Sequence, residues 1–174
     1  MNVILTGFMG TGKSTVGRRL AQRLGQTFVD LDSIIENEAG MTINEIFASQ
    51  GEGAFRDKES GVVEGLVNGS YGTDLVVATG GGAIIRESNR IGLKGWGAVI
   101  CLKTTPDEVL RRVGRAGSRP LLESDDKLQK IARMMEERDP YYADCDLLID
   151  TTDKRADEVL EIIMQFLGTF RASR

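Results

Sequence analysis

The residues that could carry chemistry most directly are Gly7-Phe8-Met9-Gly10-Thr11-Gly12-Lys13-Ser14-Thr15, which follow an apolar run at the start of the chain. They match the pattern G-x-x-x-x-G-K-[ST] of a phosphate-binding loop between a strand and a helix. Its glycines let several backbone N–H groups face one anion, at the positive end of the following helix. Lys13 can reach the β- and γ-phosphates, and the Ser14 hydroxyl can ligate Mg²⁺. The loop predicts binding of a nucleoside triphosphate and leaves hydrolysis, switching and transfer open.

Two carboxylates, Asp30 and Asp32, stand two residues apart at the end of the expected strand Thr27–Asp30, so they are expected to share one face of it. One could hold Mg²⁺ through its waters, since Mg²⁺ keeps much of its hydration shell. The other could orient an acceptor hydroxyl or take its proton. One of these aspartates could instead cap a helix that begins near Ser33. The neighbouring phosphate loop favours the catalytic interpretation.

A glycine triplet, Gly80-Gly81-Gly82, follows the expected strand Leu75–Thr79. Such a triplet can be an ordinary flexible loop, but at a strand end it also exposes backbone N–H groups to a small ligand. A usual Walker B strand would finish here with an acidic residue, and this one does not. Metal ligation is therefore expected from Ser14 and Asp30.

Three arginines, Arg56, Arg119 and Arg138, could grip an anion through bidentate bonds. Taken singly, an arginine is more often a solvated surface residue than a ligand. Arg119 lies in the segment Gly114–Asp126, which has no helical or strand periodicity. That segment is either a surface loop or a mobile lid that brings arginine to the phosphates.

Apolar, β-branched runs alternate with helical patterns along the chain, which predicts βαβ units and a parallel sheet. Ligands bind such sheets at the carboxyl ends of the strands, where the loop, the aspartates and the glycines all lie. Strands are expected at Asn2–Thr6, Thr27–Asp30, Leu75–Thr79, Ala98–Lys103 and Asp146–Asp150. Helices are expected after the phosphate loop, at Ser33–Ala39, Thr42–Gln50 and Gly53–Asn68, from Pro106 onward and at the end of the chain.

The composition narrows the class of protein. The chain has 174 residues, a net charge of −4 and a pI near 5.0, which predicts one globular domain and argues against a nucleic-acid binder. No secretory signal or membrane span is expected. Cys101 and Cys145 are expected to be buried, reduced thiols in a cytoplasmic protein. With no histidine in the chain, a zinc site is not expected, and acid–base work falls to Asp, Glu, Lys or Arg.

Taken in order, these motifs resemble those of the shikimate kinase family. The resemblance rests on the phosphate loop, Phe28-Val29-Asp30-Leu31-Asp32, Ile46-Phe47, Gly51-Glu52-Gly53-Ala54-Phe55-Arg56, Thr79-Gly80-Gly81-Gly82, Arg119-Pro120-Leu121-Leu122 and Arg138-Asp139-Pro140-Tyr141-Tyr142. It implies an α/β fold of the P-loop, nucleoside monophosphate kinase-like type: a three-layer α/β/α domain over residues 1–174 with a five-stranded parallel sheet. It also implies a mobile lid at about 114–126 and a shikimate-binding helical region at about 32–60.

The resemblance further implies that a cytoplasmic monomer uses ATP and one Mg²⁺ ion to phosphorylate the 3-hydroxyl of shikimate. The products would be shikimate 3-phosphate and ADP, on the route to chorismate and the aromatic amino acids. The catalytic residues would be Lys13, Asp32 and Arg119. ATP would contact Gly10, Thr11, Gly12, Lys13, Ser14, Thr15, Arg112 and Arg119, with Arg112 stacked on adenine. Shikimate would contact Asp32, Arg56, Gly80, Gly81, Gly82 and Arg138, and Mg²⁺ would be held by Ser14 directly and by Asp30 through water.

Some alternatives stay open. Another small-metabolite kinase of the same architecture, such as a gluconate kinase, would share the loop and the lid, although a neutral or differently charged acceptor would not need both Arg56 and Arg138. A small GTPase would carry an N-K-x-D motif, which is absent, and a scaffold with a relic site would not need the full set of charged residues. Ala156 stands where the family often has a proline, which leaves nucleotide selectivity open. Asp32 could be a general base or only orient the hydroxyl.

Overall fold

The sheet of this protein has five parallel strands, as the sequence predicts. The computed structural model describes residues 1–114 and 127–172. The sheet has the order β2-β3-β1-β4-β5, and every neighbouring pair is parallel. Each strand ends within one residue of its expected bounds: β1 is Asn2–Thr6, β2 is Thr27–Asp30, β3 is Leu75–Ala78, β4 is Gly97–Lys103 and β5 is Leu147–Asp150.

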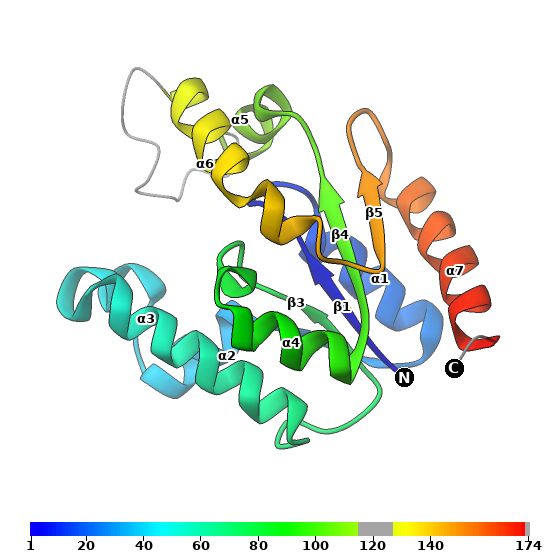
Figure 1. The fold of residues 1–174 in the computed structure, drawn as a ribbon, viewed down its shortest axis with the longest axis horizontal. Coiled ribbons are helices and arrows are strands. Elements are labelled where there is room, and N and C mark those ends of the chain that lie inside the picture. Colours follow the sequence, from blue (N-terminus) through cyan, green and yellow to red (C-terminus); the bar gives the residue numbers. More distant parts are fainter. Residues whose placement is uncertain (115–126, 173–174) are drawn as a thin grey trace.

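Helices cover both faces of the sheet, which gives the expected three layers (Figure 1). One face packs against α1 and α7, and the other packs against α2, α3 and α4. A third apolar cluster joins the phosphate loop and the end of β4 to α5 and α6. The helices are α1 (Lys13–Leu24), α2 (Leu31–Ala39), α3 (Ile43–Val67), α4 (Glu87–Trp96), α5 (Pro106–Gly114), α6 (Lys127–Tyr142) and α7 (Ala156–Ala172), with a 3₁₀ turn η1 at Ala83–Ile85.

The region after β2 differs from the expected pattern in one place. The helix α2 begins at Leu31 rather than near Ser33, so the chain enters the helix directly from the strand. The two helices expected on either side of residue 51 are confirmed: both lie within the range of α3, separated by a kink at Gly51 (φ 81°, ψ 172°). Residues with a side chain rarely adopt that backbone conformation. Glycine at position 51 therefore permits the sharp bend. The capping box of Thr42 and Glu45 fixes the start of α3.

The two cysteines are both free, as expected, but only one is fully buried. Cys101 lies on β4 within the core, and burial raises its pKa to about 12. Cys145 is half-buried, because it lies after α6 where the chain turns toward β5. The prediction of two buried thiols is therefore wrong for Cys145. Within the described residues, no helix is long and apolar enough to cross a membrane.

Candidate active site

A cleft of about 240 Å³ lies at the carboxyl ends of β1, β2 and β3. Residues from all three motifs line it, which places the phosphate loop, the aspartates and the glycine triplet around one space, as the strand-end rule predicts. The lining residues are Met9, Gly10, Gly12, Lys13, Ser14, Thr15, Asp30, Asp32, Thr79, Gly80 and Gly81.

The phosphate loop turns from β1 into α1 through glycines with positive φ, including Gly10 (76°) and Gly12 (97°). The Thr11 hydroxyl donates to the carbonyl of Phe8 at 2.8 Å, which holds the turn from inside. The Lys13 ammonium donates to the carbonyls of Gly7 and Phe8 at 2.8 and 2.9 Å. The loop therefore carries its positive charge at the N-terminus of α1, where an anion is favoured.

Asp30 has two roles at once. Its Oδ1 accepts from the backbone N–H of Asp32 at 3.2 Å and caps α2, while its Oδ2 accepts from the Ser14 hydroxyl at 2.8 Å. The capping alternative and the proposed metal role are thus compatible, because they use different oxygens. Asp32 lies in the first turn of α2 and not on the strand, so the expectation that both aspartates share one strand face is wrong. Both still line the cleft.

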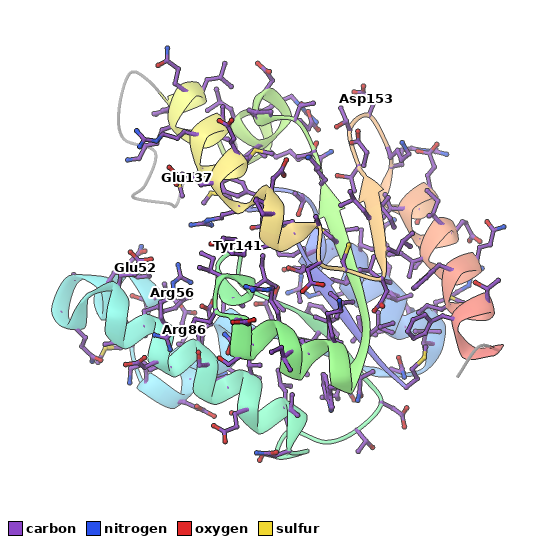
Figure 2. All side chains as sticks on the ribbon, in the orientation of Figure 1. Glu52, Arg56, Arg86, Glu137, Tyr141 and Asp153 are labelled. Carbon is purple, nitrogen blue, oxygen red and sulfur yellow. The ribbon has the colours of Figure 1, made fainter. Side chains whose placement is uncertain are left out.

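The glycine triplet is where Arg56 and Arg138 come together. A side chain at Gly82 would begin 2.1 Å from Nη1 of Arg56, so only glycine admits the guanidinium at this distance. Arg138 donates through Nη1 to the carbonyl of Gly81 at 3.3 Å. Figure 2 shows Arg56 on the side of α3 that faces α6, the helix that carries Arg138. Two cations from separate helices therefore adjoin the backbone of one triplet, in which Gly81 is partly exposed and Gly80 and Gly82 are buried.

Glu59 is a charged residue of this site that the sequence analysis missed. Its side chain is 1% exposed and pairs with Nη1 of Arg56 at 2.8 Å. Its other oxygen, Oε1, has no hydrogen-bond partner among the described residues. A Cβ at Gly80 would lie 3.0 Å from this oxygen and 2.6 Å from Oδ1 of Asp32, which places both carboxylates beside Gly80. The spacing of three residues from Arg56 is the signal that could have found it.

Burial raises the pKa of Glu59, and Asp32 adds to the increase, while Arg56 and Arg138 oppose it. The folded state therefore holds the Glu59 proton more tightly than the unfolded chain. This group stabilises the fold fully below its ordinary pKa of 4.5, and that contribution is lost as pH rises through the higher folded value.

We therefore expect Glu59→Gln to gain stability relative to the unmodified chain as pH rises above about 4.5. The slope of the difference is at most about 1.4 kcal/mol per pH unit, the limit for one proton. Urea unfolding of both proteins between about pH 4.5 and 7.5 measures it, and other carboxylates cancel in the difference. A constant difference, or one of opposite slope, would contradict the raised pKa.

The nucleotide-side residue Arg112 joins the phosphate loop to the segment after β5. It donates to the carbonyls of Gly10 and Thr151, each at 3.1 Å, and pairs with Glu108 at 2.6 Å. Ala156 is the first residue of α7, a position that favours proline. Arg112 thus lies at the edge of the loop, and its stacking on adenine stays a prediction.

Arg119 and nearly all of the expected lid, residues 115–126, lie outside the described residues.

The parallel sheet, the phosphate loop and the cleft beside it define a P-loop kinase of small molecules. The family model "Shikimate kinase" matches residues 9–168. A shikimate kinase from Geobacter metallireducens is 49% identical over 166 residues, covering 95% of this chain and 91% of the relative. One from Caldanaerobacter subterraneus is 41% identical, covering 94% of each. This chain belongs to the shikimate kinase family.

Solved structures agree with this assignment. Shikimate kinase from Acinetobacter baumannii in complex with shikimate has a TM-score of 0.90 and 40% identity, and the match covers 97% of this chain and 93% of that one. Deoxyadenosine kinase from Mycoplasma mycoides has a TM-score of 0.63 at 14% identity, covering 97% and 100%. The second likeness is one of fold alone and confirms the P-loop kinase architecture.

Proposed function

We propose that this chain transfers the terminal phosphoryl group of ATP to the 3-hydroxyl of shikimate, giving shikimate 3-phosphate and ADP on the route to chorismate and the aromatic amino acids. The observation that carries the proposal is one cleft with two subsites. The phosphate loop forms one side, and the glycine triplet flanked by Arg56 and Arg138 forms the other. The first subsite suits a triphosphate, and the second suits a small anionic alcohol.

Each charged residue has a role that its position supports. Asp32 holds the acceptor hydroxyl, because it lines the cleft between the loop and Gly80. Arg56 and Arg138 bind the shikimate carboxylate, with the triplet backbone around the ring. Lys13 neutralises charge on the transferring group, since phosphoryl transfer depends on positioning and electrostatics. Arg119 is proposed to add a second cation there on lid closure, and this stays a prediction.

The oxygen donors of the cleft fit a magnesium ion. Ser14 and Asp30 are hard ligands and adjoin each other beside the phosphate loop. Among the described residues, no group of three or more His, Cys, Asp or Glu could hold a metal. This fits an ion bound mainly by phosphate and water, with Ser14 as a direct ligand and Asp30 acting through water. When bound, Mg²⁺ would neutralise charge on the phosphates.

The decisive experiment measures ADP release with shikimate, gluconate or water as the acceptor, each with ATP and Mg²⁺. Turnover that depends on shikimate is expected, with little release in water because an enclosed site excludes it as an acceptor. Turnover with gluconate and not shikimate would favour the other small-metabolite kinase. Absence of shikimate-dependent turnover in a folded preparation would overturn the proposal.

Arg138→Ala is expected to raise the KM for shikimate by about 10- to 150-fold, because the loss of a charge-assisted bond to a carboxylate costs about 1.5–3 kcal/mol. The KM for ATP should change by less than about twofold, since Arg138 donates to the triplet and meets the phosphate loop only at the ring of Phe8, outside the expected ATP contacts Gly10–Thr15. Steady-state kinetics with each substrate varied in turn measures both. An unchanged KM for shikimate would refute the carboxylate role of Arg138.

We further propose that the chain acts as a monomer in the cytoplasm. The free thiols of Cys101 and Cys145 support a reducing compartment. Size-exclusion chromatography with light scattering tests the oligomeric state.

A further inference from the structure

The carbonyl of Gly81 accepts hydrogen bonds from two side chains of α6. The Tyr142 hydroxyl donates to it at 2.5 Å, and Nη1 of Arg138, about one helical turn earlier, donates at 3.3 Å. Tyr142 is 6% exposed, so its hydroxyl reaches the triplet from inside the protein. The shorter hydrogen bond comes from Tyr142, and the longer one comes from Arg138, which is proposed to bind the shikimate carboxylate.

Arg138 therefore has two competing partners. When its guanidinium turns toward a carboxylate, its already long bond to Gly81 weakens further. The Gly81 carbonyl is partly buried, and a partly buried carbonyl that loses its donor is destabilised by part of the cost of its desolvation. Unless another donor remains, that cost would be subtracted from the affinity for the anion.

We propose that Tyr142 is a positioning residue for the acceptor, which keeps the carbonyl of Gly81 hydrogen-bonded while Arg138 engages the shikimate carboxylate. This inference rests on the proposed role of Arg138. Tyr142 itself does not touch the substrate. Because Tyr142 keeps the Gly81 carbonyl hydrogen-bonded, Arg138 can leave that carbonyl with little loss of free energy. The same hydrogen bond fixes the backbone of the triplet.

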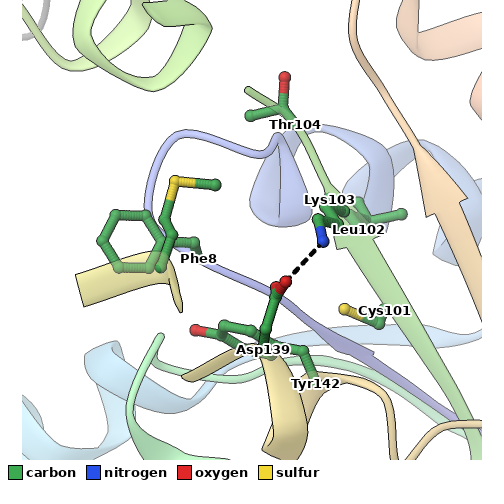
Figure 3. A pocket seen from close by; sticks show the side chains of 8 residues that line it. Phe8, Cys101, Leu102, Lys103, Thr104, Asp139 and Tyr142 are labelled. Carbon is green, nitrogen blue, oxygen red and sulfur yellow. Dashed lines mark hydrogen bonds and ion pairs between the residues drawn. The ribbon is translucent and has the colours of Figure 1, made fainter. Parts of the chain in front are cut away.

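The surroundings of Tyr142 hold its hydroxyl in place. Figure 3 shows the small pocket between β4 and α6, which Tyr142 lines together with Phe8 and Cys101. Beside this pocket, Nζ of Lys103 at the end of β4 forms an ion pair with Oδ2 of Asp139 on α6, and the two atoms are 2.8 Å apart. Burial raises the pKa of Tyr142, so the hydroxyl stays protonated and remains a donor. The last turn of α6 is thus attached to both the triplet and the sheet.

Tyr142→Phe tests the proposal, with Tyr141→Phe as its matched control. Tyr141 is the next residue along α6, its ring lies against Arg90, and its hydroxyl makes no hydrogen bond within the described residues. We expect Tyr142→Phe to raise the KM and the Kd for shikimate about tenfold, the usual effect of one buried hydrogen bond. The KM for ATP and kcat should stay within about twofold, as should every constant of Tyr141→Phe. Unchanged shikimate affinity, or equal losses for shikimate and ATP, would overturn the proposal.

A second comparison separates this role from a purely structural one. In an Arg138→Ala background, no guanidinium is released, so Tyr142→Phe should no longer change kcat/KM for shikimate. The same loss in both backgrounds would show that Tyr142 acts independently of Arg138, and would overturn the inference while leaving the carboxylate role intact. If Arg138→Ala itself has no effect, the proposed clamp fails first.

A spectroscopic readout does not depend on whether the variant folds. The chain has three tyrosines, Tyr71, Tyr141 and Tyr142, so ¹³Cζ-tyrosine labelling gives a simple spectrum. Saturating shikimate should shift the Tyr142 resonance, because its bond to Gly81 strengthens when Arg138 leaves, while Tyr71 should not respond. A Tyr142 resonance that shikimate does not move would overturn the proposal.

Discussion

Lys13→Met is expected to lower kcat about 10³-fold, with a much smaller effect on the KM for shikimate. The Lys13 ammonium lies inside the phosphate loop, where it donates to two loop carbonyls. Removal of one preorganised donor from a developing charge typically costs 10²–10³ in kcat, and a full positive charge on a transferring phosphoryl group has effects of about 10³–10⁵. Methionine keeps much of the aliphatic stem but removes the charge and the two hydrogen bonds to the loop carbonyls. Steady-state kinetics with saturating ATP and shikimate gives the result.

Lys94→Met is the matched control for this experiment. Lys94 lies on α4, pairs with Asp144 and does not line the cleft. Its replacement should leave kcat within about twofold, because an exposed ion pair contributes at most about 1 kcal/mol to stability and lies apart from the chemistry. A Lys13→Met variant that binds ATP normally and keeps more than about a tenth of kcat would contradict the proposed role, since the loss would be smaller than one preorganised donor supplies.

The sequence predicts well those parts of the site that depend on local pattern. The phosphate loop, the aspartate pair and the glycine triplet are each defined by a few consecutive residues. A parallel sheet brings the carboxyl ends of its strands, where these motifs lie, to one edge. Asp30 shows the limit of such reasoning. A helix cap and a contact with Ser14 appeared to compete for one side chain, and in the structure each uses a separate oxygen of Asp30. Sequence spacing cannot assign individual atoms.

Glu59 shows a different limit. On a helical pattern a glutamate usually faces solvent, and only the packing of α3 against η1 and the triplet buries this one. The break at Gly51 was visible as a glycine between two helical stretches, but its consequence was not. The chain bends sharply there, and the second helical stretch carries Arg56 and Glu59 to the triplet. Tertiary contacts of this kind lie beyond local periodicity.

The two arginines proposed to bind the shikimate carboxylate differ in their electrostatic support. Arg56 is 14% exposed and pairs with Glu59 at 2.8 Å and with Glu52 at 3.1 Å. Arg138 instead contacts the neutral carbonyl of Gly81 and lies over the ring of Phe8, 5.5 Å from its centroid. The first arginine therefore balances a buried charge of the fold, whereas the second contacts neutral groups there. The same substitution should have different consequences at the two positions.

Arg56→Ala is accordingly expected to lower the free energy of unfolding by about 3 kcal/mol at pH 7, because it leaves the buried carboxylate of Glu59 without its partner. Arg138→Ala should lower it by less than about 1 kcal/mol, and both should weaken shikimate binding. Urea unfolding and titration with shikimate measure the two effects separately.

The double variant Arg56→Ala/Glu59→Gln separates the charge from the packing of the arginine. If the unpaired carboxylate causes the loss, removing its charge should restore most of the stability, because a neutral amide in place of a buried ion relieves the desolvation penalty. Shikimate affinity should stay low, since the guanidinium is still absent. A double variant no more stable than Arg56→Ala would mean that the lost packing of the arginine stem dominates, and the assignment of Glu59 as a buried, charge-balanced carboxylate would then be wrong.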